Sequence, residues 1–199
     1  MIPLIVLTGP TTSGKSETAL ELANKLNTEI ISADSMQVYK YFDIGTAKNS
    51  ASARQSIPHH LIDILEPEDE FNAFDFKTQA LATIHDLMSR NKIPIVVGGT
   101  ALYLKVLIQD YDCAVEISEE TRKKIQQEIL QQGVEQVYKS LQTIDPAFAE
   151  KISETDSLRI ERALGVYRET GKPFSEFHKE DSATDMSFPI HTFIIEPIS

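Results

Sequence analysis

The chain has 199 residues, and its 19 basic and 30 acidic side chains give a formal net charge of −11. Charged residues make up 25% and hydrophobic residues 41%, a globular balance that excludes a disordered or collagen-like chain. The single cysteine, Cys113, excludes an intrachain disulfide and suits a reducing compartment. No apolar run is long enough to span a membrane, and the first residues do not have a signal peptide's pattern, so we expect a cytoplasmic protein with no membrane partner. The acidic balance argues weakly against a nucleic-acid partner.

Short apolar runs alternate with amphipathic segments through the first half of the chain. We expect strands at 2–8, 29–32, 60–64 and 93–97, and helices at 15–26, 74–89 and 100–108. Strands that alternate with helices form parallel βαβ units. The pattern therefore predicts an α/β fold in which helices flank a parallel sheet.

Beyond residue 117 the pattern becomes helical. We expect helices at 121–132, 134–141, 145–152 and 157–170, with Ser118 at the first helix start and Gly133 as a stop. A strand-like pattern returns at 189–195. We therefore predict an α/β core made of residues 1–117 and 183–199, whose last strand rejoins the sheet, and a smaller all-helical insertion domain at 118–182.

Residues 9–16 match the phosphate-loop pattern G-x-x-x-x-G-K-[ST] without a deviation. Glycines let consecutive backbone N–H groups turn toward phosphate oxygens, and the N-terminus of the following helix attracts anions. Lys15 adds a positive charge, and the Ser16 hydroxyl is a candidate Mg²⁺ ligand. The predicted phosphate-binding residues are Gly9, Pro10, Thr11, Thr12, Ser13, Gly14, Lys15 and Ser16. The loop alone leaves open an ATP-using kinase, a GTPase or a diphosphate-using transferase.

Two further candidates follow predicted strands, at the carboxyl edge where functional residues of parallel sheets gather. Asp34 comes just after the second strand and could bind metal, act as a base, or cap the next helix. Thr100 follows Gly98 and Gly99 after the fourth strand. Its hydroxyl could point into the same cleft or cap the helix that follows, and the sequence does not decide between the two.

Several other polar residues have a plainer interpretation. Lys48 follows a glycine, and we favour a solvated turn there over an anion contact. His59 and His60 are adjacent on a predicted strand and would point to opposite faces, so a shared metal is not expected. Arg159 and Arg162 lie three residues apart on a predicted helix, where they suit either nucleic-acid phosphates or a solvated face.

Six segments together resemble the tRNA dimethylallyltransferase family, and the resemblance covers essentially the whole chain. In order they are the phosphate loop at 9–16, Ile-Ser-Ala-Asp-Ser-Met-Gln-Val-Tyr at 31–39, Asp-Ile-Gly-Thr-Ala-Lys at 43–48, Pro-His-His-Leu-Ile-Asp at 58–63, Val-Gly-Gly-Thr-Ala-Leu-Tyr at 97–103 and Arg-Ile-Glu-Arg-Ala-Leu at 159–164. The resemblance implies a sheet like that of the P-loop nucleoside triphosphatases.

The resemblance also implies an activity. The family transfers a dimethylallyl group from dimethylallyl diphosphate to N6 of an adenine beside the tRNA anticodon and releases diphosphate. Lys15 and Mg²⁺ would neutralise the diphosphate, Asp34 would take the N6 proton, and Thr100 would hydrogen-bond near the bridging oxygen. The implied tRNA-contacting residues are Asp34, Ser35, Met36, Gln37, Leu158, Arg159, Ile160, Glu161 and Arg162. We expect a monomer whose partners are tRNA and dimethylallyl diphosphate.

Members of the resembled family continue beyond the strand that ends near Ile195, so we expect their C-terminal region to be absent from these 199 residues. In relatives that region supplies a diphosphate-binding arginine and further tRNA-binding helices. A small-molecule kinase, a prenyltransferase for free adenine nucleotides and a non-catalytic diphosphate-binding module stay open as alternatives. The net charge does not exclude tRNA, because a nucleic acid meets only a local face.

Overall fold

A computed structural model describes residues 1–108, 115–177 and 188–196. The chain divides into two compact units, one formed by Met1–Asp110 with Ala183–Ser199 and the other by Tyr111–Ser182. Cys113 lies outside the described residues. Within the described ranges, none of the helices combines the length and the apolar character needed to cross a membrane.

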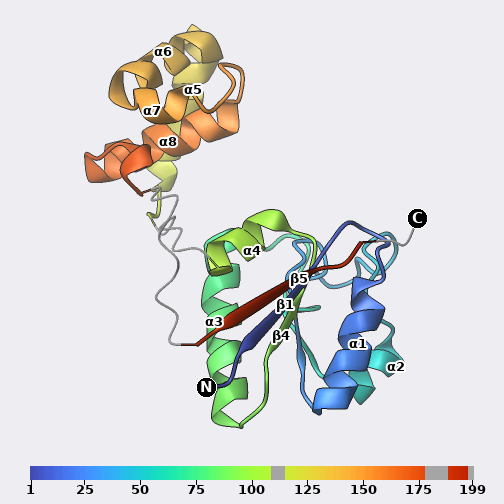
Figure 1. Ribbon diagram of the computed structural model, residues 1–199. Helices are drawn as coiled ribbons and strands as arrows, with labels where there is room; N and C mark the ends of the chain where they lie inside the picture. The colour runs from blue at the N-terminus through green and yellow to red at the C-terminus, as the bar shows by residue number, and fades with distance from the viewer. Residues whose placement is uncertain (109–114, 178–187, 197–199) are drawn as a thin grey trace. The chain divides into compact units, whose positions relative to one another are not determined.

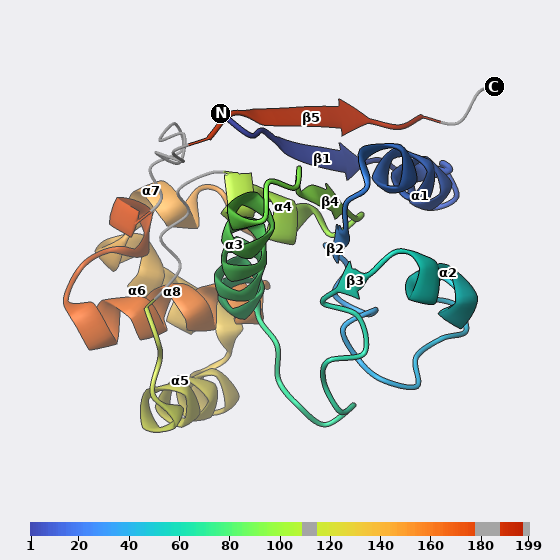
Figure 2. The same cartoon turned by 90° about the horizontal axis from the view of Figure 1, so that it is seen from below.

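The first unit is built on a parallel sheet. Its strands, in the described residues, are β1 (Leu4–Thr8), β2 (Ile30–Ser32), β3 (His59–His60), β4 (Ile95–Val97) and β5 (Ile190–Ile194). They pair in the order β3-β2-β4-β1-β5, so that β3 and β5 form the two edges (Figure 2). The predicted parallel α/β sheet is therefore confirmed, and β5 does rejoin it, along the whole of β1.

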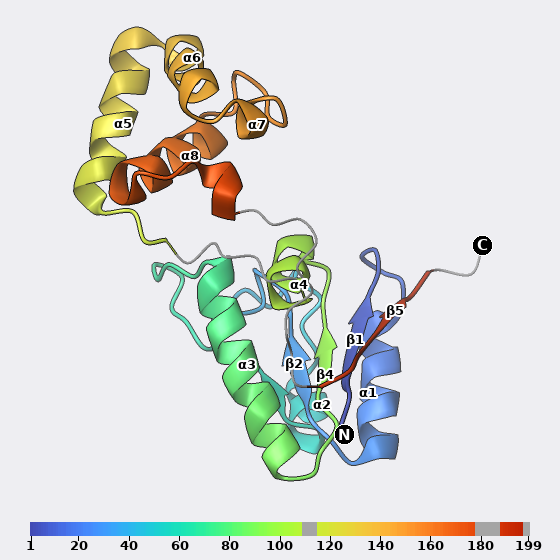
Figure 3. The same cartoon turned by 60° about the vertical axis from the view of Figure 1, so that its left-hand side comes forward.

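Helices lie on both faces of this sheet. α1 (Lys15–Leu26) covers one face, and α3 (Ala73–Ser89) and α4 (Ala101–Ile108) cover the other (Figures 1 and 3). Leu7, Ile30 and Ile95 pack with Ala19 and Ala23 of α1. Because a parallel sheet is buried on both faces, β2 and β4 consist of buried residues throughout, which accounts for their continuous apolar runs.

The predicted strand at 60–64 is wrong beyond its first residue. Leu61 and Asp63 have φ angles of +60° and +56°, which lie outside the extended region, so β3 ends at His60. The apolar residues Leu61 and Ile62 are buried in the connection that follows the strand. The sequence did not predict α2 (Ala51–Ser56), a short polar helix that the side chain of Ser50 caps.

The second unit is helical. It comprises α5 (Glu119–Gln132), α6 (Val134–Ile144), α7 (Pro146–Ala149), α8 (Ser157–Thr170) and a 3₁₀ turn at Phe174–Phe177. Ser118 accepts a hydrogen bond from the Thr121 N–H at the start of α5, and Gly133 ends that helix, both as predicted. The helix expected at 145–152 is shorter, since α7 ends at Ala149. Ile125, Leu141, Ile160 and Leu164 form the centre of its core.

Candidate active site

The carboxyl ends of three neighbouring strands, β2, β4 and β1, lie on the same side of the sheet, and a candidate functional segment follows each strand. The phosphate loop follows β1, Asp34 follows β2, and Gly98–Thr100 follows β4. This is the position at which parallel α/β sheets bind their ligands. The sequence-predicted candidates of the first unit therefore meet because of the strand order.

The phosphate loop presents backbone and side-chain donors at this edge. Gly14, with φ +85°, directly precedes α1, so the unpaired N–H groups of the first helical turn lie at the end of the loop. Lys15 Nζ donates a hydrogen bond to the Pro10 carbonyl oxygen at 2.9 Å. Ser13 Oγ is buried and has no hydrogen-bond partner within the described part of the chain. That hydroxyl is therefore available to an oxygen of a bound anion.

The Ser16 hydroxyl also lines the site, and it is the predicted Mg²⁺ ligand. Among the described residues no three His, Cys, Asp or Glu side chains gather into a metal-binding group. Mg²⁺ at nucleotide phosphates is commonly held by few protein oxygens, with substrate oxygens and water completing its shell. A single hydroxyl oxygen, that of Ser16, fits that mode of binding.

Asp34 holds the turn that follows β2. Its Oδ1 accepts hydrogen bonds from the N–H groups of Met36 at 2.9 Å and Gln37 at 3.2 Å. The residues that follow form turns, so the interpretation of Asp34 as a helix cap is corrected to a turn cap. Oδ2 accepts no hydrogen bond from the residues that the structure describes and is left for a ligand.

Thr100 ties the ends of β2 and β4 together. Its Oγ1 accepts a hydrogen bond from the Ser35 N–H at 3.0 Å, so this hydroxyl bonds across strands instead of capping α4. Gly98 allows the close approach, since a Cβ built on it would lie 2.1 Å from the Ala33 carbonyl oxygen. The turn at Gly99 also lies beside Lys15, whose Cε would be 3.8 Å from a Cβ there.

These segments enclose a pocket of about 660 Å³. Its walls are the phosphate loop and first turn of α1 at 11–17, the turn at 34–37, the segment at 45–47 and the turn at 97–100, together with Ile30, Ser32, Asn49, His59 and Ile62. The pocket brings together Lys15, Ser16, Asp34 and Thr100, while Gly9 and Pro10 of the loop are not in its lining. Sequence reasoning missed the part played by residues 45–47, Asn49 and His59 in the pocket wall, although the Asp-Ile-Gly-Thr-Ala-Lys segment could have indicated the first of these.

The two adjacent histidines have separate partners. His59 Nε2 lies 2.8 Å from Asn49 Nδ2, and its Nδ1 lies 2.6 Å from the Ile57 carbonyl oxygen. Burial lowers the pKa of His59, which favours the neutral imidazole. His60 Nε2 instead lies 2.7 Å from a carboxylate oxygen of Glu29. Each imidazole therefore has a structural partner of its own.

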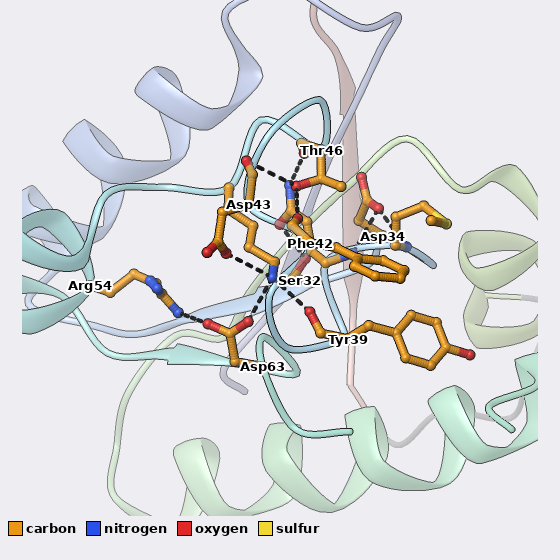
Figure 4. A network of polar contacts seen from close by, with 11 residues as sticks. Ser32, Asp34, Tyr39, Phe42, Asp43, Thr46, Arg54 and Asp63 are labelled. Carbon is orange, nitrogen blue, oxygen red and sulfur yellow. Dashed lines mark hydrogen bonds and ion pairs between the residues drawn. The ribbon is translucent and has the colours of Figure 1, made fainter. Parts of the chain in front are cut away.

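Lys48 neither faces the pocket, where it could contact a bound anion, nor belongs to a solvated turn. Its side chain is only 2% exposed, and its ammonium group lies 2.6 Å from Asp63 Oδ1 and 3.1 Å from Asp43 Oδ1. Arg54 forms a second ion pair with Asp63 (Figure 4). The two predicted alternatives for Lys48 are both wrong, because paired carboxylates compensate its burial.

The residues of the second unit that the resemblance implied as tRNA contacts differ in accessibility. Leu158 is 76% exposed, and Arg159 is exposed with an ion pair to Asp156 at 3.4 Å. Glu161 is half-buried and accepts a hydrogen bond from Gln126 at 3.1 Å, and Arg162 is also half-buried. Ile160 is 0% exposed, which corrects its inclusion: its side chain packs in the core.

The model of one protein family, described as IPP transferase, matches residues 37–198. A tRNA dimethylallyltransferase 2 of Geotalea uraniireducens is 46% identical over 184 residues, which are 92% of this chain and 59% of that protein. A tRNA dimethylallyltransferase of Acetivibrio thermocellus is 45% identical over 193 residues, 96% of this chain and 61% of that protein. The chain thus spans about three fifths of the length of these curated relatives.

Solved structures give the same picture. A eukaryotic dimethylallyltransferase acting on tRNA superposes with a TM-score of 0.80 at 32% identity, over 98% of this chain and 48% of that one. A full-length tRNA isopentenylpyrophosphate transferase of Bacillus halodurans superposes with a TM-score of 0.56 at 38% identity, over 87% of this chain and 57% of that one.

Proposed function

This chain belongs to the IPP transferase family, and from that premise we propose that it transfers a dimethylallyl group from dimethylallyl diphosphate to N6 of an adenine next to the anticodon of tRNA. The observation that carries the proposal is the shared pocket of the phosphate loop, Asp34 and Thr100. A leaving diphosphate and a proton acceptor are the two requirements of this substitution. A kinase has the same two requirements, because its acceptor hydroxyl also loses a proton, so it is the family match together with the pocket that favours prenyl transfer.

The reaction breaks the allylic C–O bond, and the electron pair leaves with the diphosphate. A new C–N bond forms to the adenine, and the N6 proton passes to a base. Asp34 is suited to take that proton, because its Oδ1 is fixed by the turn while Oδ2 is left for the substrate. An exocyclic amine is a weak nucleophile, so orientation by a fixed carboxylate contributes to the rate.

Negative charge develops on the diphosphate as the C–O bond breaks, and stabilising that charge is the largest contribution a protein can make. The loop N–H groups at the start of α1, Lys15 and the Ser13 hydroxyl, which has no described partner, would perform this task. Thr100 would hydrogen-bond near the bridging oxygen. Ser16 would hold a Mg²⁺ ion, which would supply further positive charge to the leaving group.

The adenine has to leave the base stack to reach a pocket of this kind, and unpaired loop bases of RNA do so most readily. The turn Asp34–Gln37 would then meet the base, and the exposed Leu158 and Arg159 would contact tRNA. We further propose a cytoplasmic, monomeric enzyme.

The test is mass analysis of tRNA nucleosides from cells with and without the gene. We expect a dimethylallyl adenosine that disappears with the gene, that returns with the wild-type gene and that does not return with Asp34→Asn. Unchanged nucleosides in cells without the gene contradict the proposal. In vitro, the full-length protein with Mg²⁺ should consume dimethylallyl diphosphate and leave ATP untouched, whereas a kinase would do the reverse.

A further inference from the structure

Lys48 joins three separate stretches of chain through one ammonium group. Nζ donates to the Tyr39 carbonyl oxygen at 2.6 Å, to Asp63 Oδ1 at 2.6 Å and to Asp43 Oδ1 at 3.1 Å. Figure 4 labels these three acceptor residues. An ammonium group has three donors, and here each has its own acceptor. Lys48 follows the loop at residues 43–47. It therefore holds this loop against the connection that follows β3.

The same loop reaches the pocket through Gln37. Residues 45–47 form one wall of the pocket, and the carbonyl oxygen of Thr46 accepts a hydrogen bond from Gln37 Nε2 at 2.9 Å. The other end of that amide, Oε1, accepts from the Ser32 hydroxyl at 3.0 Å. The backbone N–H of Gln37 is one of the two donors that fix Asp34 Oδ1. Together with the backbone of the loop between Asp43 and Thr46, these bonds connect Lys48 to Asp34.

The backbone around this cluster is strained. Tyr41, Ala47, Leu61 and Asp63 all have φ angles between +51° and +67°, in the left-handed region that side chains rarely adopt. Such residues persist where surrounding contacts over-determine their conformation, and they gather at functional sites. Tyr41 precedes the loop that Lys48 holds and Ala47 is its last residue, while Leu61 and Asp63 lie in the connection that follows β3.

We propose that Lys48 is a positioning residue, whose ion pairs with Asp43 and Asp63 hold the 43–47 loop so that Gln37 keeps Asp34 oriented for proton transfer. The proposal rests on the proposed function for the role of Asp34. Lys48 itself does not touch the substrate, because it is buried and outside the pocket lining. Among the described residues, removing its charge would leave Asp63 with Arg54 as its ion-pair partner, and the loop would keep the Gln37–Thr46 hydrogen bond but lose its ionic attachment to Asp63.

Lys92 provides a matched control. Its Nζ also lies 2.6 Å from a carboxylate, Oε1 of Glu29, but this pair lies at the amino ends of β2 and β4, and neither residue lines the pocket. A lysine that acts only on stability would change the melting temperature without changing the site, and Lys92 is the more exposed of the two, at 28% against 2%. Lys48→Met and Lys92→Met should both lower the melting temperature, and only Lys48→Met should alter the site.

The test compares the two variants in the full-length protein by hydrogen exchange and by transfer kinetics. We expect Lys48→Met to speed amide exchange at Met36 and Gln37 at least tenfold. Its kcat should fall between tenfold and a hundredfold, the loss that a displacement of about 1 Å at a reacting group can cause. The KM for dimethylallyl diphosphate should stay within about twofold, because the phosphate loop is untouched. Lys92→Met should leave exchange at the turn and kcat at the wild-type level.

Unchanged exchange at Met36 and Gln37 in Lys48→Met overturns the proposal, and so does an equal loss of kcat in Lys92→Met. If Lys48→Met does not fold, Asp43→Asn replaces it: this side chain is 64% exposed, so the variant should fold and still speed exchange severalfold. An unchanged rate there also overturns the proposal. A wild-type protein that transfers no prenyl group refutes the proposed function, while the exchange comparison still decides what Lys48 holds.

Discussion

Gly98→Ala puts a methyl carbon where the backbone leaves no room. Its Cβ would lie 2.1 Å from the carbonyl oxygen of Ala33 and 2.4 Å from the carbonyl carbon. These atoms cannot simply retreat, because the Ala33 N–H donates to the Val97 carbonyl oxygen at 2.8 Å and the Ala33 carbonyl oxygen accepts from the Thr100 N–H at 3.3 Å. The methyl group therefore forces apart two strand ends that hydrogen bonds hold together.

The size of the effect follows from the distances. Real Cβ atoms essentially never approach other heavy atoms closer than 3.0 Å, so a shift of about 1 Å is needed. Overpacking of this kind costs about 1–3 kcal/mol. For a protein of this size each kcal/mol lowers the melting temperature by about 2–4 °C, which gives a fall of about 2–12 °C. Asp34 directly follows Ala33, so kcat should fall by up to about a hundredfold.

The assay is thermal unfolding followed by circular dichroism, with Gly99→Ala as the control. A Cβ on Gly99 would meet nothing closer than 3.8 Å, which is ordinary van der Waals contact. The control should therefore melt within about 2 °C of the wild type, as most exposed substitutions do. Equal melting temperatures for Gly98→Ala and the wild type, or an equal fall in the control, would refute the steric argument.

Three further outcomes follow from single residues. Ile160→Ala should destabilise the helical unit by about 2–5 kcal/mol in chemical denaturation, because the side chain is fully buried, whereas exposed Leu158→Ala should have no effect. The hydrogen bond from Arg90 holds the pKa of the Glu29 carboxyl far below its ordinary value. Burial opposes this shift, and hydrogen bonds with Lys92 and His60 reinforce it. The stabilisation from Glu29 is therefore present above about pH 4.5 and is lost as the pH falls, so melting temperatures between pH 6 and pH 3 should drop less steeply in Glu29→Gln than in the wild type. Ser13→Ala should leave stability unchanged or raised, since the hydroxyl has no described partner, yet weaken calorimetric diphosphate binding by about tenfold or more; unchanged binding would exclude Ser13 from the site.

Local pattern was sufficient for the sheet and most helices. The runs that became β1, β2 and β4 are short, apolar and followed by turn residues, and a parallel sheet buried on both faces requires that pattern. The same reasoning failed after β3, where Leu61 and Ile62 look like strand residues because they are buried. They are buried in the connection that follows β3, where Leu61 has a left-handed φ and the Asp63 N–H donates a hydrogen bond to the Gln37 carbonyl oxygen, which is distant in sequence.

The site shows the same division. The phosphate loop could be proposed from the sequence because its pattern consists of adjacent residues in one spacing. The role of Lys48 could not be predicted, because it depends on Asp63, fifteen residues away, and on the turn that brings that carboxylate close to the lysine. The order of predicted strands indicated that Asp34 and Thr100 lie at the same end of the sheet. It did not indicate that the Thr100 hydroxyl bonds to Ser35, which is 65 residues distant. Hydrogen bonds between segments far apart in sequence leave no periodic signal.

The net charge of the chain says little about which ligand the pocket would bind, because the pocket has few charged side chains. Its charged lining residues, within the described chain, are Lys15, Glu17 and Asp34, so side chains alone leave it slightly negative. Lys48 and Arg54 lie nearby, but Asp43 and Asp63 neutralise them. If the pocket binds the proposed diphosphate, most of the attraction would come from the loop N–H groups and the N-terminus of α1, which no count of lysines and arginines records. Because Glu17 and Asp34 repel that anion, a divalent cation beside Ser16 would contribute more here than in a basic pocket.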